Sequence, residues 1–163
     1  MENKTMPLTS RDHAGVYVPP PLIYVSLFFV SILCQRAIPL PYGWLKSPGA
    51  QIIGGVFIMS GITFLLPSLW RFLVSRNTLI TIKPAHSLQT TGIYSFSRNP
   101  MYLALLCLYL GIAIFKGNLW TIAMVPVIVV IIQTYVIKKE EHYLIRAFGN
   151  EYLDYMKRVR RWL

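Results

Sequence analysis

The chain has 163 residues, enough for one domain, and 55% of them are hydrophobic whereas only 13% are charged. A soluble domain carries roughly 25% charged residues, so this composition argues against a soluble globular protein. No Asp or Glu occurs between Asp12 and Glu140, as expected where lipid makes an acidic side chain costly. The net charge of +10 does not indicate a nucleic-acid partner, because the basic residues flank apolar blocks and anionic lipid headgroups are the expected counter-charge. The sequence therefore predicts an integral membrane protein.

Four apolar blocks separated by polar, Pro- or Gly-marked segments predict four transmembrane helices. A polar arm, residues 1–18, precedes them, and we expect it to be poorly ordered. In chain order the blocks cover about residues 22–38, 50–73, 101–115 and 119–137. Asn99-Pro100 before the third block is a favourable helix start, with Asn as the N-cap. Small residues thin one side of the second block and predict close approach of a neighbouring helix: Gly54, Gly55, Ser60 and Gly61.

The last segment of the chain is amphipathic. From residue 138 on, apolar side chains recur at steps of three and four and form one stripe of a helix: Leu144, Phe148, Tyr152, Tyr155, Val159 and Trp162. Such a helix lies along the membrane surface or folds back over the protein, and Gly149-Asn150 is a point where it breaks or bends. The predicted fold class is all-α: a single membrane-embedded domain over residues 1–163, with about four transmembrane helices and a C-terminal amphipathic cytosolic helix.

Lys and Arg are distributed unequally between the two sides that four spans create. Thirteen of the sixteen lie on the side of the termini and of the connection between the second and third spans. The other side holds Arg36, Lys46 and Lys116. Because cytoplasmic loops carry the excess of positive charge, we expect both termini and this connection to face the cytosol.

Two polar segments should meet at the cytosolic surface. The connection over residues 83–102 reads KPAHSLQTTGIYSFSRNPMY, and a polar connection of this length between apolar helices favours function over a simple solvated loop. The second segment begins with Glu140, Glu141 and His142, directly after the fourth span. On residue type alone, this glutamate pair fits a solvated helix start equally well.

The two segments carry an ordered set of motifs. The runs TTGIYSFSRNPMY and EEHYLIRAFGNEYLDYMKRV resemble the isoprenylcysteine carboxyl methyltransferase and phospholipid methyltransferase superfamily. That family's pattern is Gly-x-Tyr, then Arg-His/Asn-Pro-x-Tyr, and later Glu-Glu-x-x-Leu-x-x-x-Phe-Gly-x-x-Tyr-x-x-Tyr. Every part occurs here in order: Gly92 and Tyr94; Arg98, Asn99, Pro100 and Tyr102; Glu140, Glu141, Leu144, Phe148, Gly149, Tyr152 and Tyr155. The resemblance covers about residues 86–159, the C-terminal half.

The resemblance implies methyl transfer from S-adenosylmethionine, bound on the cytosolic side by the cofactor-binding half, residues 83–163, and not in a Rossmann domain. Arg98 and Glu141 would be the catalytic residues. A guanidinium can hold the cofactor's carboxylate bidentately, and Glu141, like His86 or His142, is a candidate base for an amine acceptor. By residue-wise match, the cofactor site would contain His86, Ser87, Leu88, Gln89, Tyr94, Asn99, Pro100, Met101, Tyr102 and Glu140. No metal site is predicted, because Cys34 and Cys107 lie within apolar blocks without metal spacing.

The acceptor implied by the resemblance is a lipid or lipid-anchored molecule, and two chemistries stay open. Asn99 replaces the His that is usual in the carboxyl methyltransferase branch, and residues 133–137 lack the Arg which that branch tends to place there. Both features favour a phospholipid amine. His86-Ser87-Leu88, by contrast, resembles the carboxyl branch's His-Thr-Leu and favours an isoprenylcysteine carboxylate.

Two other classes of protein are the alternatives. A small four-span transporter usually needs an ionisable group within a span, whereas the only charge within the first two spans is Arg36, near an end, and the other two have none. A non-enzymatic scaffold anchored by the amphipathic helix would leave the ordered motifs unexplained.

Overall fold

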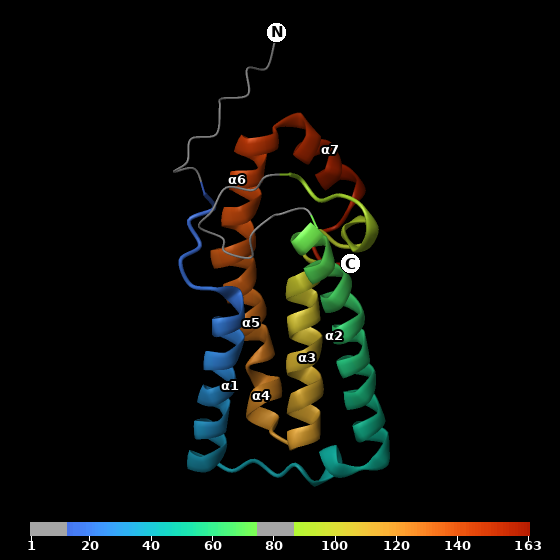
Figure 1. The fold of residues 1–163 in the computed structure, drawn as a ribbon. Helices are drawn as coiled ribbons and strands as arrows, with labels where there is room; N and C mark the ends of the chain where they lie inside the picture. Colours follow the sequence, from blue (N-terminus) through green and yellow to red (C-terminus); the bar gives the residue numbers. More distant parts are fainter. Residues whose placement is uncertain (1–12, 75–86) are drawn as a thin grey trace.

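The computed structural model describes residues 13–74 and 87–163 (Figure 1). Within these residues all regular elements are helical, which confirms the all-α prediction. The α-helices are α1 (Pro20–Ala37), α2 (Pro48–Val74), α3 (Pro100–Lys116), α4 (Leu119–Ala123), α5 (Val125–Ile131), α6 (Lys138–Phe148) and α7 (Asn150–Arg158). Two 3₁₀ turns, η1 (Gly43–Lys46) and η2 (Gly92–Ser95), and a π-helical segment, η3 (Ile132–Ile137), complete the set.

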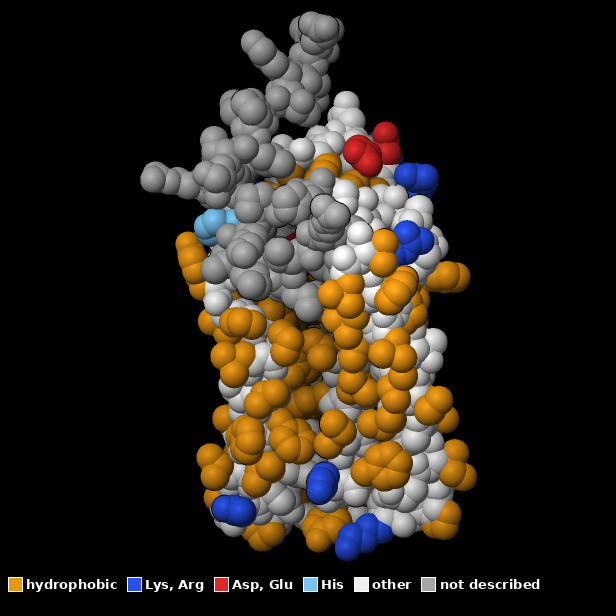
Figure 2. Space-filling view, viewed as in Figure 1, with side chains coloured by type: hydrophobic (Ala, Val, Ile, Leu, Met, Phe, Trp, Pro, Cys, Tyr) orange, Lys and Arg blue, Asp and Glu red, His pale blue; other side chains and the backbone are white. Residues whose placement is uncertain are grey.

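The long helices stand side by side as a bundle whose surface suits a bilayer. In the described part of the chain, three helical stretches are long and apolar enough to cross a membrane: Pro20–Ala37, Pro48–Arg71 and Leu119–Phe148. The third is the continuous rod of α4, α5, η3 and α6. At 17 residues, α3 is shorter, about 26 Å, but it lies within the same bundle (Figure 1). Figure 2 shows hydrophobic side chains along the bundle and basic side chains toward both of its ends, so the chain is an integral membrane protein.

Glycines allow α2 and α3 to pack closely. A methyl group at Gly61 would lie 2.7 Å from Leu108 Cγ. A methyl group at Gly111 would lie 2.9 Å from the backbone oxygen of Gly54, so both helix backbones meet there. The predicted close approach is therefore confirmed at Gly54 and Gly61, whereas Gly55 faces open space. Without a hydrophobic driving force between helices in lipid, such contact is what holds a pair together.

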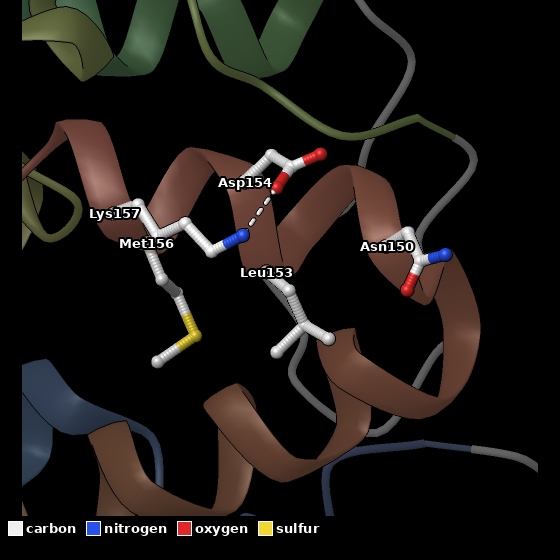
Figure 3. A pocket seen from close by; sticks show the side chains of 5 residues that line it. All are labelled: Asn150, Leu153, Asp154, Met156 and Lys157. Atoms are coloured by element: carbon white, nitrogen blue, oxygen red, sulfur yellow. Dashed lines mark hydrogen bonds and ion pairs between the residues drawn. The ribbon is translucent and has the colours of Figure 1, made fainter.

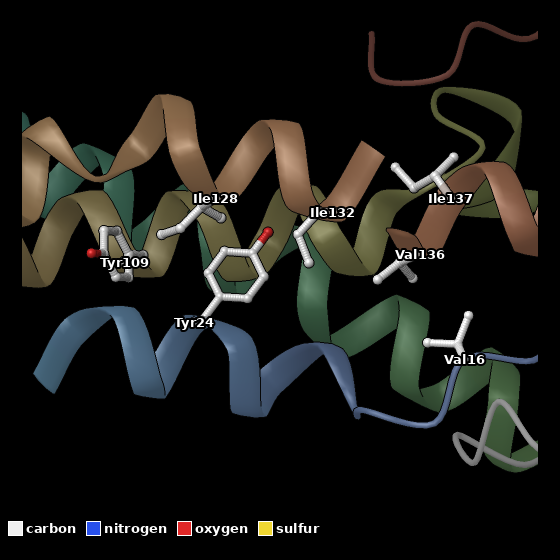
Figure 4. Packing of buried hydrophobic residues seen from close by; sticks show 7 residues of the cluster. All are labelled: Val16, Tyr24, Tyr109, Ile128, Ile132, Val136 and Ile137. Carbon is white, nitrogen blue, oxygen red and sulfur yellow. The ribbon is translucent and has the colours of Figure 1, made fainter. Parts of the chain in front are cut away.

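The buried core joins the last rod to α1 and α3 and includes the segment before α1 (Figure 4). Its members are Val16, Tyr24, Tyr109, Ile128, Ile132, Val136 and Ile137. Val16 is only 1% exposed. Lys139 Nζ donates to Gly15 O at 3.3 Å, and Val18 N donates to Tyr135 Oη at 3.3 Å. The expectation of a poorly ordered arm is therefore wrong for residues 13–18, because an apolar side chain there fills the core; residues 1–12 lie outside the described part.

The C-terminal segment differs from the single amphipathic helix that its pattern predicts. The part up to Phe148 is α6, which continues the last rod beyond its apolar length. Gly149 has φ 54°, ψ −126°, and there the chain turns into α7, which folds over the end of the bundle (Figure 1). Tyr152 and Tyr155 are buried as the stripe predicts, but Val159 is extended and ends the helix. The turn occurs because glycine tolerates positive φ.

Candidate functional site

The two polar segments meet at the end of the bundle that carries α7. Tyr102, in the first turn of α3, donates from its hydroxyl to Glu140 Oε1 at 2.7 Å. Arg98, two residues before α3, places Nη1 3.2 Å from Glu141 Oε1. Glu140 and Glu141 both come from the first turn of α6. The Arg98-Asn99-Pro100-x-Tyr102 motif and the glutamate pair are therefore in direct contact, although about forty residues of chain separate them.

Glu141 is the centre of a buried ionic cluster. Its side chain is 10% exposed and that of Arg98 is 9% exposed. Arg161, from the segment after α7, donates from Nε to Oε1 at 3.0 Å and from Nη2 to Oε2 at 2.6 Å. This fork of two charge-assisted hydrogen bonds uses both carboxylate oxygens. Glu141 is thus held by guanidinium groups from two sides.

The Arg98 guanidinium keeps unused donors. Its Nη1 is at ion-pair distance from Glu141 but not in hydrogen-bond geometry, and its Nε is also buried without a hydrogen-bond acceptor among the described residues. An unsatisfied buried donor costs free energy, so these atoms are suited to an anionic ligand group.

Glu140 has different surroundings. It is half-buried, its contact is the neutral Tyr102 hydroxyl, and the Tyr102 carbonyl in turn accepts from Tyr24 Oη at 3.0 Å. The Tyr24 hydroxyl ties α1 to the start of α3. Since no guanidinium occupies Glu140 in the described contacts, it is the member of the pair better placed to accept hydrogen bonds from a ligand.

Buried tyrosines join η2 to α7. Tyr155 Oη donates to the Tyr94 carbonyl at 2.6 Å. Burial raises the pKa of both Tyr94 and Tyr155, and it raises the pKa of Tyr152 to about 12. These hydroxyls stay protonated at physiological pH, and that of Tyr155 is a neutral donor to the Tyr94 carbonyl. Gly92, at the start of η2, has φ +65°, and a methyl group there would meet Arg71 Nη2 at 3.1 Å, which explains glycine in the motif.

The remaining predicted cofactor residues that the structure describes lie in the segment before η2 and at the start of α3. Ser87 and Gln89 share a hydrogen bond of 2.9 Å in the segment before η2, and Leu88 between them is half-buried. Pro100 is fully buried at the start of α3, and Met101 next to it is half-buried. His86 lies outside the described residues.

Asn99 and His142 differ from what their positions suggested. The Asn99 side chain makes no cap hydrogen bond to α3; it donates from Nδ2 to the Arg161 carbonyl at 2.9 Å. His142 is exposed on α6, whereas its neighbours Glu141 and Tyr143 are buried. The exposed position of His142 does not favour it as a base.

Sequence reasoning missed Arg161 because its spacing matches the polar face of an amphipathic helix. One signal was available: a glutamate next to a membrane span needs a counter-charge, and residues 133–137 supply none. The groove along α7 carries none of the predicted site residues (Figure 3). It has a volume of about 590 Å³ and is lined by Asn150, Leu153, Asp154, Met156 and Lys157.

Comparison with known proteins places the chain in a family of methyltransferases. The family model described as phospholipid methyltransferase matches residues 50–151. This chain belongs to the phospholipid methyltransferase family. An uncharacterized protein of Haemophilus influenzae is 40% identical over 63 residues, which are 39% of this chain and 100% of that protein. No solved structure matches the chain significantly.

Membership in the phospholipid methyltransferase family makes this chain a membrane methyltransferase. The matched residues run from α2 into the first turn of α7 and contain the first motif and the second motif as far as Gly149. Helix α1, the segment before it and Arg161 lie outside the match.

Proposed function

We propose that this protein transfers a methyl group from S-adenosylmethionine to a lipid or lipidated acceptor at the cytosolic membrane face. The observation that carries the proposal is the direct contact of Arg98 and Tyr102 with Glu141 and Glu140 at one end of the bundle. In a family of methyltransferases, motifs that meet in this way at a membrane surface indicate the reaction site.

The residues present suit the proposed cofactor. S-adenosylmethionine bears a carboxylate, an ammonium group, a ribose diol and an aromatic base. Arg98 has unused buried donors for a carboxylate, and Glu140 is an acceptor for hydroxyl or ammonium protons. Tyr94 and Tyr102 supply aromatic rings, and we assign His86, Ser87, Leu88, Gln89, Asn99, Pro100 and Met101 to the same site.

The protein's own task would be to align the acceptor and exclude water. When bound, the cofactor supplies an electrophilic methyl group on its sulfonium. A carboxylate acceptor, as in an isoprenylcysteine, needs no base. A phospholipid amine must first lose a proton, and we assign that proton to Glu140 because two guanidinium groups hold Glu141. Glu141 then serves catalysis by fixing Arg98.

We assign the α7 end of the bundle to the cytosol. The described basic residues at this end include those of α6, α7 and the segment after α7, whereas Arg36, Lys46 and Lys116 lie at the opposite helix ends. The excess of positive charge follows the rule for cytoplasmic segments. Soluble S-adenosylmethionine would then reach the site directly.

Calorimetric binding of S-adenosylhomocysteine to the detergent-purified protein tests the proposal, with adenosine and ATP as controls. Saturable and selective binding supports a methyltransferase over the transporter and scaffold alternatives. A folded, monodisperse sample that binds none of the three would overturn it. Labelled cofactor and total lipid extract then distinguish the acceptors, since a methyl ester of a carboxylate is released by base and an N-methyl group is not.

A further inference from the structure

The segment after α7 runs directly across the candidate site. Arg98 N donates to the Arg160 carbonyl at 3.0 Å, and Asn99 Nδ2 donates to the Arg161 carbonyl at 2.9 Å. Trp162 packs against the core cluster, with Nε1 3.5 Å from Gln133 Oε1 on η3. The segment therefore joins the residues before α3 to the last rod, and it does so beside the glutamate pair.

Arg161 is the side chain through which this segment acts on the site. It is 30% exposed, but its guanidinium takes both oxygens of the buried Glu141. The hydrogen bonds to Glu141 raise the pKa of Arg161, whose guanidinium is in any case protonated at physiological pH. With both oxygens engaged by Arg161, Glu141 leaves Nε of Arg98 without an acceptor among the described residues.

Removal of the Arg161 side chain would free both carboxylate oxygens of Glu141 for Arg98. Glu141 would be left buried with Arg98 as its one remaining cation in the described cluster. A buried carboxylate that loses one cationic partner forms hydrogen bonds with the nearest remaining donor, because an uncompensated buried charge is strongly destabilising. Arg98 would then rotate its fork onto Glu141 and would no longer offer donors to a ligand.

We propose that Arg161 is a positioning residue of the methyl-transfer site: by holding Glu141 bidentately, it keeps the donors of Arg98 available for the carboxylate of the cofactor. This inference rests on the proposed function. It assigns a role to a residue beyond the 50–151 family match. It also makes the last residues of the chain part of the site.

The test compares two ligands that differ in their amino-acid part. S-adenosylhomocysteine has the carboxylate, whereas 5′-methylthioadenosine has the same nucleoside without it. We expect Arg161→Gln to raise the Kd of S-adenosylhomocysteine roughly tenfold, the effect of one charge-assisted contact, and that of 5′-methylthioadenosine less than about twofold. Arg161→Lys should fall between, because an ammonium keeps the charge but lacks the fork.

Arg158→Gln is the matched control. This variant also removes one positive charge, three residues before Arg161. The Arg158 side chain is exposed, and its described hydrogen bond is to the Asp154 carbonyl. We expect both dissociation constants to stay within about twofold of the wild type. Equal weakening of both ligands in Arg161→Gln, or no weakening beyond that of Arg158→Gln, would overturn the inference.

A second measurement separates this inference from the proposed function. If the wild type binds neither ligand, the proposed function fails, but coupling between Arg161 and Glu141 can still be read from melting temperatures in detergent. Arg161→Gln, Glu141→Gln and the double variant form a cycle. A double variant that melts close to Glu141→Gln supports the positioning contact, and strictly additive shifts overturn it.

Discussion

Two adjacent glutamates in the site have different surroundings, and this difference decides their roles. Glu141 is buried between Arg98 and Arg161, whereas Glu140 is half-buried and meets the neutral Tyr102 hydroxyl. Successive helical residues point about 100° apart, so neighbours in sequence need not share an environment. We therefore assign to Glu141 the role of holding the site together, and to Glu140 that of accepting hydrogen bonds from a ligand.

We expect Glu140→Ala to raise the Kd of S-adenosylhomocysteine about tenfold while the melting temperature changes little, because a half-buried acceptor with one hydroxyl partner is removed. Calorimetry and a detergent melting curve measure the two effects. His142→Ala is the control, since His142 is exposed on the same helix. An unchanged affinity in Glu140→Ala would exclude Glu140 from the cofactor site.

At the scale of elements, the pair α2–α3 provides the platform for Arg98 and Tyr102. We predict that Gly111→Ala lowers stability by about 1–3 kcal/mol, because the added methyl would lie 2.9 Å from the Gly54 carbonyl and the backbones must separate. Thermal unfolding in detergent measures this. Gly55→Ala, which faces open space, should be neutral or slightly stabilising. Similar melting of the two variants would contradict the close approach.

The segment before α1 also belongs to the fold. We predict that Val16→Ala lowers stability by roughly 1–3 kcal/mol, because its side chain is 1% exposed in the core cluster. Val18→Ala is the control, since Val18 is 40% exposed. Thermal unfolding in detergent gives the melting temperature of each variant. Equal melting temperatures would show that residues 13–18 do not stabilise the bundle.

At the scale of the whole molecule, the distribution of charge predicts orientation. In a background without Cys34 and Cys107, we expect Lys46→Cys to react with a membrane-impermeant maleimide on intact cells and Lys157→Cys to react only after lysis. Lys46 lies in η1 and Lys157 in α7, at opposite ends of the bundle. The reverse pattern would place the candidate site outside, away from cytosolic S-adenosylmethionine.

The sequence by itself determined the membrane class, the approximate helices and the contact between the two motifs. Apolar blocks of spanning length, and acids confined to the ends, are local and compositional signals. The four predicted spans put Arg98 and Tyr102 on the same side of the membrane as Glu140 and Glu141, and the structure joins them by a hydrogen bond and an ion pair. The positions of Asn99 and Gly149 at helix boundaries were also readable, because turn and cap residues act over a few positions.

Only the tertiary structure decided which side chains share the site. Arg161 is separated from Glu141, and Val16 from the rest of the core cluster, by other elements, and periodicity carries no information on such distant contacts. The extended chain after Val159 is set by hydrogen bonds to Arg98 and Asn99, which override the amphipathic pattern. These contacts are determined by packing between remote segments and by the need of a buried carboxylate for cations, and local sequence patterns report neither.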